Sequence, residues 1–164
     1  MTSSRATASS PIEAELSATD APALPGSLDA DDFKTLFRGQ PGGVAVITAD
    51  DGTGPVALTA TSVASVSVDP PLLVFSVSAL SSAAATILKA STVVVHLLDG
   101  DDLGVARLAS TSGVDRFADT SAWSRLTTGE PVYNGVRAWV RCAVVDRLEA
   151  GSATVVAAHA LQSR

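Results

Sequence analysis

Small hydroxyl side chains are the most prominent chemical feature of the sequence, and many of them lie in the segment 56–68. In its second half, Val63, Ser65 and Ser67 alternate with their neighbours, so that one face of an extended strand is rich in small hydroxyls. A hydroxyl donates one hydrogen bond and accepts two, but it does not ionise at neutral pH. The segment therefore indicates hydrogen bonding rather than proton transfer, although a single serine or threonine is more often an ordinary residue of an exposed strand.

Residues of greater reactivity are few, and each has a structural interpretation. His96 lies in a run of valine and leucine and is expected to be a core or half-buried histidine, and Cys142 is expected to be buried and inert. Residues 99–102 contain three aspartates, but Ser110 stands where a calcium loop needs a glutamate, so we expect a solvated turn. Asp69-Pro70-Pro71 ends one strand and directs the next. No catalytic acid, base, nucleophile or metal ligand is predicted.

Composition and charge narrow the class of protein. The 164 residues suffice for one domain of ordinary size with a tail, and an apolar fraction of 46% is enough for a buried core. The net charge of −6 has the wrong sign for binding nucleic acid. The sequence has one cysteine, no apolar run long enough to cross a membrane and no signal-peptide core. We therefore expect a cytoplasmic protein with neither nucleic acid nor membrane as a partner.

The pattern of hydrophobic residues predicts a mainly β protein. Residues 1–28 show no sustained period and are predicted to be a disordered N-terminal tail, and 29–164 form the domain. Six strands are expected, at 44–48, 56–68, 72–78, 92–98, 136–148 and 153–161, and helices at 29–38, 82–90 and 101–110. Few helices and no βαβ repetition favour a β-barrel, whose interior or dimer contact is expected to be filled by Trp123, Tyr133 and Trp139.

Two stretches of the chain resemble a known family. They are Pro41-Gly-Gly-Val-Ala-Val-Ile-Thr48 and the segment 54–78, which contains Leu58-Thr-Ala-Thr-Ser62, the alternating serines and Asp69-Pro-Pro71. With Arg116-Phe117 and Trp123, they are similar to the flavin reductase-like family over about residues 33–161. The resemblance implies an FMN-binding split β-barrel of Greek-key type with a few short flanking helices.

The same resemblance implies an activity. Members of the family reduce FMN or FAD by direct hydride transfer, with NADH or NADPH as the electron donor, and supply the reduced flavin to a partner monooxygenase. They are homodimers with the flavin near the subunit interface, so we expect a homodimer here.

The resemblance also implies which residues hold the flavin. The hydroxyls of 59–62 match contacts to the ring and the ribityl chain, 76–78 match a second strand end, and 82–83 lie where the phosphate is received. Arg107 and Leu108 match a further contact, with Arg107 as a charge partner for the phosphate. The full predicted set is Pro55, Val56, Ala57, Leu58, Thr59, Thr61, Ser62, Ser76, Val77, Ser78, Ser82, Ala83, Arg107 and Leu108.

The sequence departs from the family at two places. Where the family has Gly-Asp-His, with the histidine near the nicotinamide, this chain has Gly151-Ser152-Ala153. His159 lies six residues further on, about 20 Å along an extended strand, and is not expected to be a substitute. The sequence ends at Arg164, so the domain is expected to lack the family's usual C-terminal segment. These departures leave open an alternative, a flavin-binding module or truncated paralogue without reductase activity.

Overall fold

The structure, a computed structural model, describes residues 29, 31, 34 and 42–164. The chain divides into two compact units, 1–40 and 41–164, and the sheet and helices described here belong to the second. The predicted tail at 1–28 and most of the predicted helix at 29–38 lie outside the described residues. No helix in the described part of the chain has both the length and the apolar character that a bilayer crossing requires.

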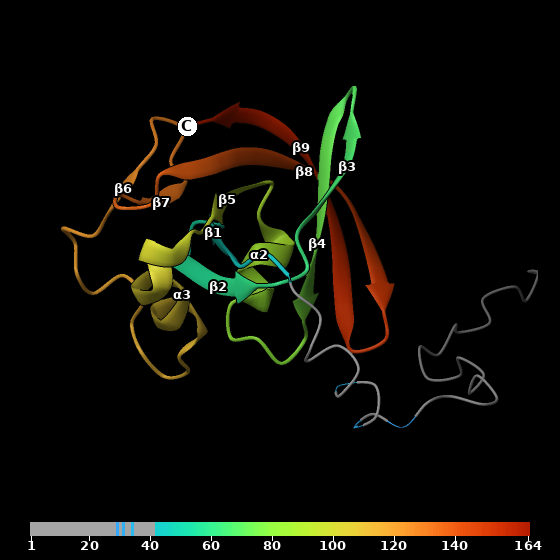
Figure 1. The fold of residues 1–164 in the computed structure, drawn as a ribbon, viewed down its shortest axis with the longest axis horizontal. Coiled ribbons are helices and arrows are strands. Elements are labelled where there is room, and N and C mark those ends of the chain that lie inside the picture. The colour runs from blue at the N-terminus through green and yellow to red at the C-terminus, as the bar shows by residue number, and fades with distance from the viewer. Residues whose placement is uncertain (1–28, 30, 32–33, 35–41) are drawn as a thin grey trace, which may run out of the picture. The chain divides into compact units, whose positions relative to one another are not determined.

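One seven-stranded sheet forms most of the domain (Figure 1), with its strands in the order β2-β1-β5-β8-β9-β4-β3. Every pair of neighbours in this sheet is antiparallel. The strands are β1 (Ala45–Asp50), β2 (Pro55–Ala60), β3 (Ala64–Val68), β4 (Pro71–Ser78), β5 (Thr92–Leu97), β8 (Ala138–Ala150) and β9 (Ala153–Ser163). The prediction of a mainly β protein is confirmed.

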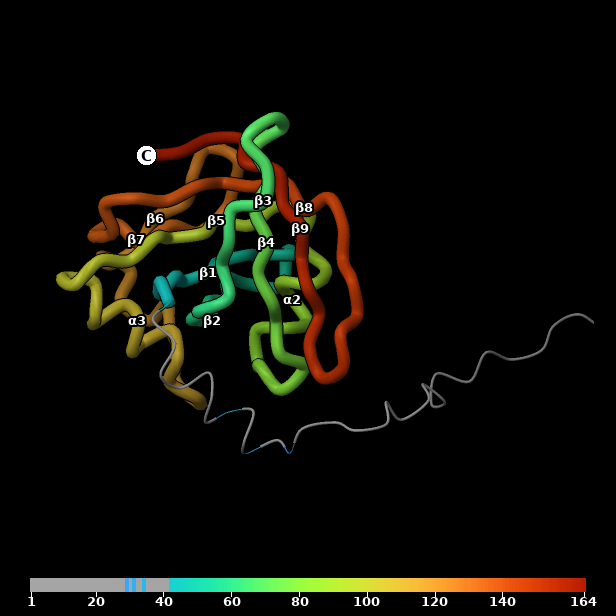
Figure 2. The backbone as a smooth tube through the Cα atoms, turned by 45° about the vertical axis from the view of Figure 1, so that its right-hand side comes forward, coloured from blue at the N-terminus to red at the C-terminus, as the bar shows by residue number. Residues whose placement is uncertain are grey.

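The sheet is open, because its two edge strands, β2 and β3, do not pair with each other. β2 ends at Ala60 and β3 begins at Ala64, so that only residues 61–63 join the two edges. β2 pairs with β1 and β3 pairs with β4, and the two edges do not pair with each other. The sheet must therefore curl until its edges are one corner apart, and Figure 2 shows β2 close to β3 and β4. The result is a barrel that is split between β2 and β4.

The prediction of one strand over 56–68 is wrong, because this corner divides it. Valine, alanine, serine and threonine continue through positions 61–63 without a proline or glycine, so the pattern gives no sign of the bend. A second difference is the hairpin of β6 (Trp123–Arg125) and β7 (Pro131–Tyr133), in a region that the sequence left irregular. Strands of three residues are too short to display a period.

The two helices of the second unit are near their predicted places. α2 (Ala84–Lys89) begins two residues later than predicted, and the Ser81 hydroxyl accepts a hydrogen bond from the N–H of Ala83 just before it. A 3-10 turn, η1 (Gly100–Asp102), leads into α3 (Leu103–Ser110). The side chains of Asp99 and Asp102 hold the backbone of this turn in a capping box, in keeping with the predicted solvated turn.

Buried side chains of the barrel include the residues for which the sequence predicted a structural role. His96, Tyr133, Trp139 and Cys142 are all buried, whereas Trp123 is half-buried. Burial raises the pKa of the Cys142 thiol to about 11, so the thiol remains protonated and unreactive at neutral pH.

His96 connects three strands through its ring. Nδ1 donates to the carbonyl of Val46 (3.0 Å) on β1, and Nε2 accepts the backbone N–H of Tyr133 (3.1 Å) on β7. Since a backbone N–H can only donate, Nε2 is the unprotonated nitrogen and the ring is neutral. Burial lowers the pKa of His96 to about 4, because the charged imidazolium is poorly solvated in the core.

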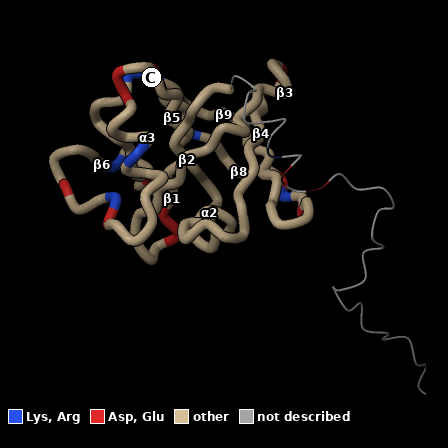
Figure 3. The backbone as a smooth tube through the Cα atoms, turned by 60° about the horizontal axis from the view of Figure 1, so that its bottom comes forward, with Lys and Arg blue, Asp and Glu red and all other residues tan. Residues whose placement is uncertain are grey.

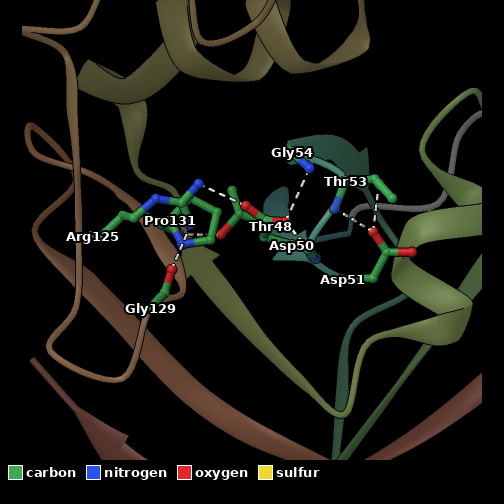
Figure 4. A network of polar contacts seen from close by, with 9 residues as sticks. Thr48, Asp50, Asp51, Thr53, Gly54, Arg125, Gly129 and Pro131 are labelled. Carbon is green, nitrogen blue, oxygen red and sulfur yellow. Dashed lines mark hydrogen bonds and ion pairs between the residues drawn. The ribbon is translucent and has the colours of Figure 1, made fainter.

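The small β6–β7 hairpin is attached to β1 by polar contacts (Figure 4). The Thr48 hydroxyl donates to the carbonyl of Pro131 (2.5 Å), and the Arg125 guanidinium donates both to Asp50 and to the carbonyl of Gly129 (2.6 Å each). Burial acts to raise the pKa of Asp50, but the hydrogen bonds from Arg125 and from the turn that follows β1 outweigh it and lower the pKa. Because the hairpin ends at Tyr133, these contacts also fix that residue.

Charged residues occur as short, separate stretches along the described backbone, with no long run of either sign (Figure 3). This distribution, with the net charge of −6, gives the described part of the chain no extended basic face of the kind that binds a polyphosphate backbone.

We expect the free energy of unfolding to fall as the pH is lowered, because the unfolded state binds a proton on His96 that the folded state does not. With a pKa of about 4 when folded and about 6.5 when unfolded, the loss between pH 7 and pH 5 is about 2 kcal/mol. Urea unfolding at the two pH values measures it. His159→Gln should keep the pH dependence of the free energy of unfolding, and His96→Gln should reduce it by this amount. The same pH dependence in the wild-type chain and in both variants would contradict the assignment of this proton to His96.

Candidate functional site

A cavity of about 260 Å³ lies at the split of the barrel. It exists there because β2 and β4 face each other without a ladder of backbone hydrogen bonds. The split brings together the end of β2, the corner, the end of β4 and the start of β9. Its lining residues are Leu58, Thr59, Ala60, Thr61, Ser62, Ser76, Ser78, Ser81 and Ala153.

Three serines of this cavity keep a free proton to donate. Each accepts a hydrogen bond from a backbone N–H, so its own O–H is not used by that bond. Thr59 differs, because its hydroxyl donates to the carbonyl of Ala106 (2.7 Å) and fastens α3 to β2. The cavity therefore suits a ligand with several oxygen or nitrogen acceptors. The three serine bonds are Ser62 from Ser76 (2.9 Å), Ser78 from Leu80 (3.3 Å) and Ser81 from Ala83 (3.3 Å).

A second cavity, of about 300 Å³, adjoins the first and shares Leu58, Thr59 and Ser81 with it. Its wall is mostly polar and contains one cation, Arg116. Together the two adjacent cavities are called the groove; hydroxyls line both of them, and a guanidinium lines the second. The residues that line only the second cavity are Leu80, Ser82, Ala109, Ser110, Ser112, Gly113 and Arg116.

The structure brings half of the predicted site residues to this groove. On a strand, successive side chains point to opposite faces, so a run of neighbouring residues cannot all face one ligand. Accordingly Ala57, Val77 and Ala83 are buried in the core, and Pro55 and Val56 line neither cavity. The predicted residues that line the groove are Leu58, Thr59, Thr61, Ser62, Ser76, Ser78 and Ser82.

The arginine beside the serines is not the one that the sequence predicted. Arg107 is exposed on α3 and lines neither cavity, and Leu108 packs against the core. Arg116 instead lies with Nη1 at 3.4 Å from the Ser82 hydroxyl. The sequence marked Arg116 as part of the Arg116-Phe117 pair of the resemblance but gave it no ligand, and its contact with Ser82 depends on the loop that follows α3. The predicted set also lacks Ser81, which precedes the predicted Ser82, and Ser110 and Ser112, which lie at the end of α3 and in that loop.

Ala153 is the first residue of β9, pairs with Ser78 and lines the first cavity. The position that the resemblance assigned to a histidine thus faces the groove, with a methyl group in place of an imidazole. His159 pairs with Leu72 near the other end of β4 and lines neither cavity, as expected.

Tyr133 supports the loop that carries Arg116. Its hydroxyl donates to the backbone carbonyl of Arg116 (3.0 Å), and its ring stacks on Phe117 with centroids 5.4 Å apart. The indole N–H of Trp123 donates to the carbonyl of Phe117 (3.0 Å) from the other side. Burial raises the pKa of Tyr133 to about 12, so the hydroxyl stays protonated and keeps this bond at any physiological pH.

Known proteins are similar to this chain over most of its length. Residues 37–162 match the flavin reductase like domain. The chain is 41% identical over 142 residues to an NADH:FMN oxidoreductase of Rhodococcus qingshengii, covering 87% of this chain and 73% of the relative. It is also 34% identical over 116 residues to the reductase component of a flavin-dependent trigonelline monooxygenase of Acinetobacter baylyi, covering 70% of this chain and 37% of that protein.

A solved structure is similar in fold. The NADH:FAD oxidoreductase of Streptomyces globisporus, in complex with NAD and FAD fragments, superposes with a TM-score of 0.76 at 28% identity. The match covers 83% of this chain and 82% of the other.

Tyr133 is the one tyrosine of the chain, so its ionisation can be followed in the near-ultraviolet absorbance of the whole protein. We expect the folded protein to show a tyrosinate midpoint near pH 12, because burial disfavours the charged phenolate and raises the pKa of Tyr133. The protein in denaturant serves as the control, with a midpoint of about 10. A folded midpoint at the denatured value would show that the hydroxyl is exposed.

Proposed function

Because the chain belongs to the flavin reductase-like family, we propose that it reduces FMN or FAD with NADH or NADPH as the electron donor. The observation that carries this proposal is the groove at the split of the barrel, where three serine hydroxyls with free protons and one guanidinium converge. In support, the residues that line this groove lie within the segment 37–162 that matches the family.

The donor set of the groove fits a flavin. A flavin has a flat ring with acceptor atoms on its rim, a chain of hydroxyls and a phosphate. Ser62, Ser78 and Ser81 offer O–H donors, Leu58 and Ala60 offer apolar contact, and Arg116 offers positive charge. The unpartnered donor atoms of the groove thus match the acceptor atoms of the ligand in kind.

The role of the protein in this reaction is binding and orientation. Hydride acceptance from the nicotinamide is the chemistry that a flavin supplies when bound. Ser62 and Ser78 hold their hydroxyls in fixed directions, because each is already bonded to the backbone, and fixed donors lower the entropic cost of alignment. No side chain of the groove is an acid or base of suitable pKa, so we assign no proton-transfer step to this chain.

A partner monooxygenase is part of the proposal. The similarity to a protein that is the reductase component of a flavin-dependent monooxygenase supports it, since a reductase component works with a second component. We place the reaction in the cytoplasm, where the nicotinamide nucleotides are found.

One observation favours the alternative, a flavin-binding module without reductase activity. Ala153 lines the groove at the position where the resemblance expects a histidine near the nicotinamide. A methyl group cannot hydrogen-bond to the nicotinamide of the electron donor, so the chain contributes less to the orientation of the nicotinamide there.

We further propose a homodimer that covers the open edge of the sheet. On β3, Val66 is 60% exposed and Val68 is 87% exposed. Beside them is a mainly apolar groove of about 210 Å³, to which Ser65 and Ser67 of the same strand contribute. An exposed edge strand next to an apolar surface is ordinarily covered by another chain. A second copy of this chain would cover both the edge of β3 and the apolar groove beside it.

The activity is tested with the purified chain, by mixing it with FMN or FAD and following the absorbance of NADH and NADPH. We expect flavin-dependent oxidation, and we expect Ser62→Ala combined with Ser78→Ala to weaken flavin binding about 10-fold or more through the loss of two hydrogen bonds. Ser163→Ala, at the far end of β9, is the control and should change neither quantity. Flavin binding without oxidation of either nucleotide would support the alternative module, and no binding at all would contradict both.

The dimer is tested by sedimentation of the wild-type chain and of Val66→Asp combined with Val68→Asp. Placing two carboxylates in an apolar interface should give a monomer, since a charge without a partner is costly to bury. Val145→Asp, at a valine of β8 that is 54% exposed and lies outside the apolar groove, should leave the dimer intact. A wild-type monomer that still holds flavin would refute the dimer without affecting the activity.

A further inference from the structure

A single Asn-Gly pair occurs in the sequence, at Asn134-Gly135, and it forms the turn that follows β7. Both residues are exposed, and the backbone N–H of Val136 closes the turn on the carbonyl of Tyr133 (3.4 Å). A Cβ placed on Gly135 would meet nothing within 4 Å apart from its chain neighbours, so no other described residue crowds this peptide bond. Because glycine has no Cβ of its own, its backbone nitrogen is the one that most readily attacks the side-chain amide of a preceding asparagine.

The side chain of Asn134 is held by two hydrogen bonds. Its Oδ1 accepts the hydroxyl of Ser124 (2.6 Å), and its Nδ2 donates to the carbonyl of Ser121 (3.1 Å). The backbone N–H of Asn134 also donates to the carbonyl of Ala122 (2.9 Å), so three hydrogen bonds attach this residue to the segment 121–124. Both side-chain bonds direct the amide toward that segment, and they must break before its carbon can turn onto the nitrogen of Gly135.

We propose that Asn134 is a site of spontaneous deamidation, and that the opening of its two side-chain hydrogen bonds controls the rate. In the first step the Gly135 nitrogen gives its proton to a base in the solvent and bonds to Cγ of Asn134. The bond from Cγ to Nδ2 breaks, and the amide nitrogen leaves as ammonia with a proton from water. Water then opens the resulting succinimide ring at either carbonyl carbon and gives aspartate or isoaspartate, so that one water is consumed, one ammonia is released and nothing is oxidised or reduced.

The product loses a contact that holds the segment around Trp123. A carboxylate has no proton to donate, so the bond from Asn134 to the Ser121 carbonyl becomes a repulsion between two acceptor oxygens. Trp123 lies between the two serines that Asn134 holds, and its indole N–H donates to the carbonyl of Phe117 (3.0 Å). We therefore expect deamidation to loosen the indole bond of Trp123.

The rate is measured by mass spectrometry of the whole chain during incubation at alkaline pH, with and without guanidinium chloride. Asn134 is the one asparagine of the sequence, and Gln40 and Gln162 react much more slowly because their ring would have six members, so a gain of one mass unit reports Asn134. We expect the folded chain to react about 10- to 100-fold more slowly than the unfolded chain, because two hydrogen bonds must open first. A folded chain that reacts as fast as the unfolded chain, or not at all over about 100 of its half-times, would overturn the inference.

Two variants separate the chemical step from the opening of the side-chain bonds. Gly135→Ala fits the turn, since the space around Gly135 is open and its φ lies outside the left-handed region, and it should slow the reaction in the folded and the unfolded chain alike. Ser124→Ala removes one of the two side-chain bonds and should speed the reaction about 3- to 10-fold in the folded chain alone. Ser152→Ala, at an exposed serine of the β8–β9 turn, is the control and should change neither rate. An unchanged rate in Gly135→Ala, or no acceleration in Ser124→Ala, would overturn the inference.

Asn134→Asp tests the effect on the segment, because it introduces the carboxylate without the reaction. We expect the indole proton of Trp123 to exchange with solvent about 3- to 10-fold faster, as measured by NMR, since the bond to Ser121 is lost. The indole proton of Trp139, which belongs to a different cluster of buried residues, should keep its rate. Unchanged exchange at Trp123, or equally faster exchange at both tryptophans through a general loss of stability, would overturn this effect.

None of these measurements uses flavin, so this inference and the proposed function fail separately. A chain that deamidates as described but binds no flavin refutes the proposed function alone. A chain that reduces flavin while Asn134 stays unchanged refutes the deamidation site alone.

Discussion

The corner at residues 61–63 is the constraint on which the site depends. It joins the two edge strands of one sheet, but β2 pairs with β1 and β3 pairs with β4, so no hairpin forms at this corner and the barrel stays split between β2 and β4. In a closed barrel this space would be filled by a ladder of backbone hydrogen bonds. Here it is lined by serine and threonine, whose hydroxyls partly replace the missing ladder, as in the bond from the N–H of Ser76 to Ser62. A binding groove is thus a direct consequence of how the sheet is connected.

A second constraint acts from the interior. His96 is neutral and buried, and lies on β5. Its two ring nitrogens bond to Val46 of β1 and to the backbone of Tyr133, and the Tyr133 hydroxyl in turn bonds to Arg116. The hairpin that ends at Tyr133 is tied to β1 by Thr48 and Arg125. His96, Thr48 and Arg125 line neither cavity of the groove, so they serve to hold the loop rather than to touch a ligand. The core and the site are therefore one connected structure.

Much of the fold could be predicted from the sequence, and the reasons for the failures are physical. The strands around His96 and Cys142 were recognised because runs of β-branched residues are a strong signal, and both side chains are buried as predicted. The corner at 61–63 was missed because serine and threonine are compatible with either a strand or a bend. The hairpin β6–β7 was missed because its strands are short and its stability comes from Arg125 and Thr48, which are remote in sequence from their partners.

The candidate site could be predicted in part. The order of hydroxyls from Thr59 to Ser78 was sufficient to find the wall of the groove, since residues next to one corner stay together in any curled sheet. Arg116 was noticed in the sequence only as part of the Arg116-Phe117 pair, and its place beside Ser82 was not predicted, because that contact depends on the loop after α3 and on a tyrosine further along the chain. Long-range contacts of this kind leave no local pattern in the sequence.

The central claim, that the split of the barrel is a flavin site, is tested most directly by a crystal structure of this chain grown with FMN. The account predicts the flavin between β2 and β4, in contact with Ser62 and Ser78, with its phosphate beside Ser82 and Arg116. Flavin density at another place, such as the apolar groove beside β3, with the split left to solvent, would contradict it.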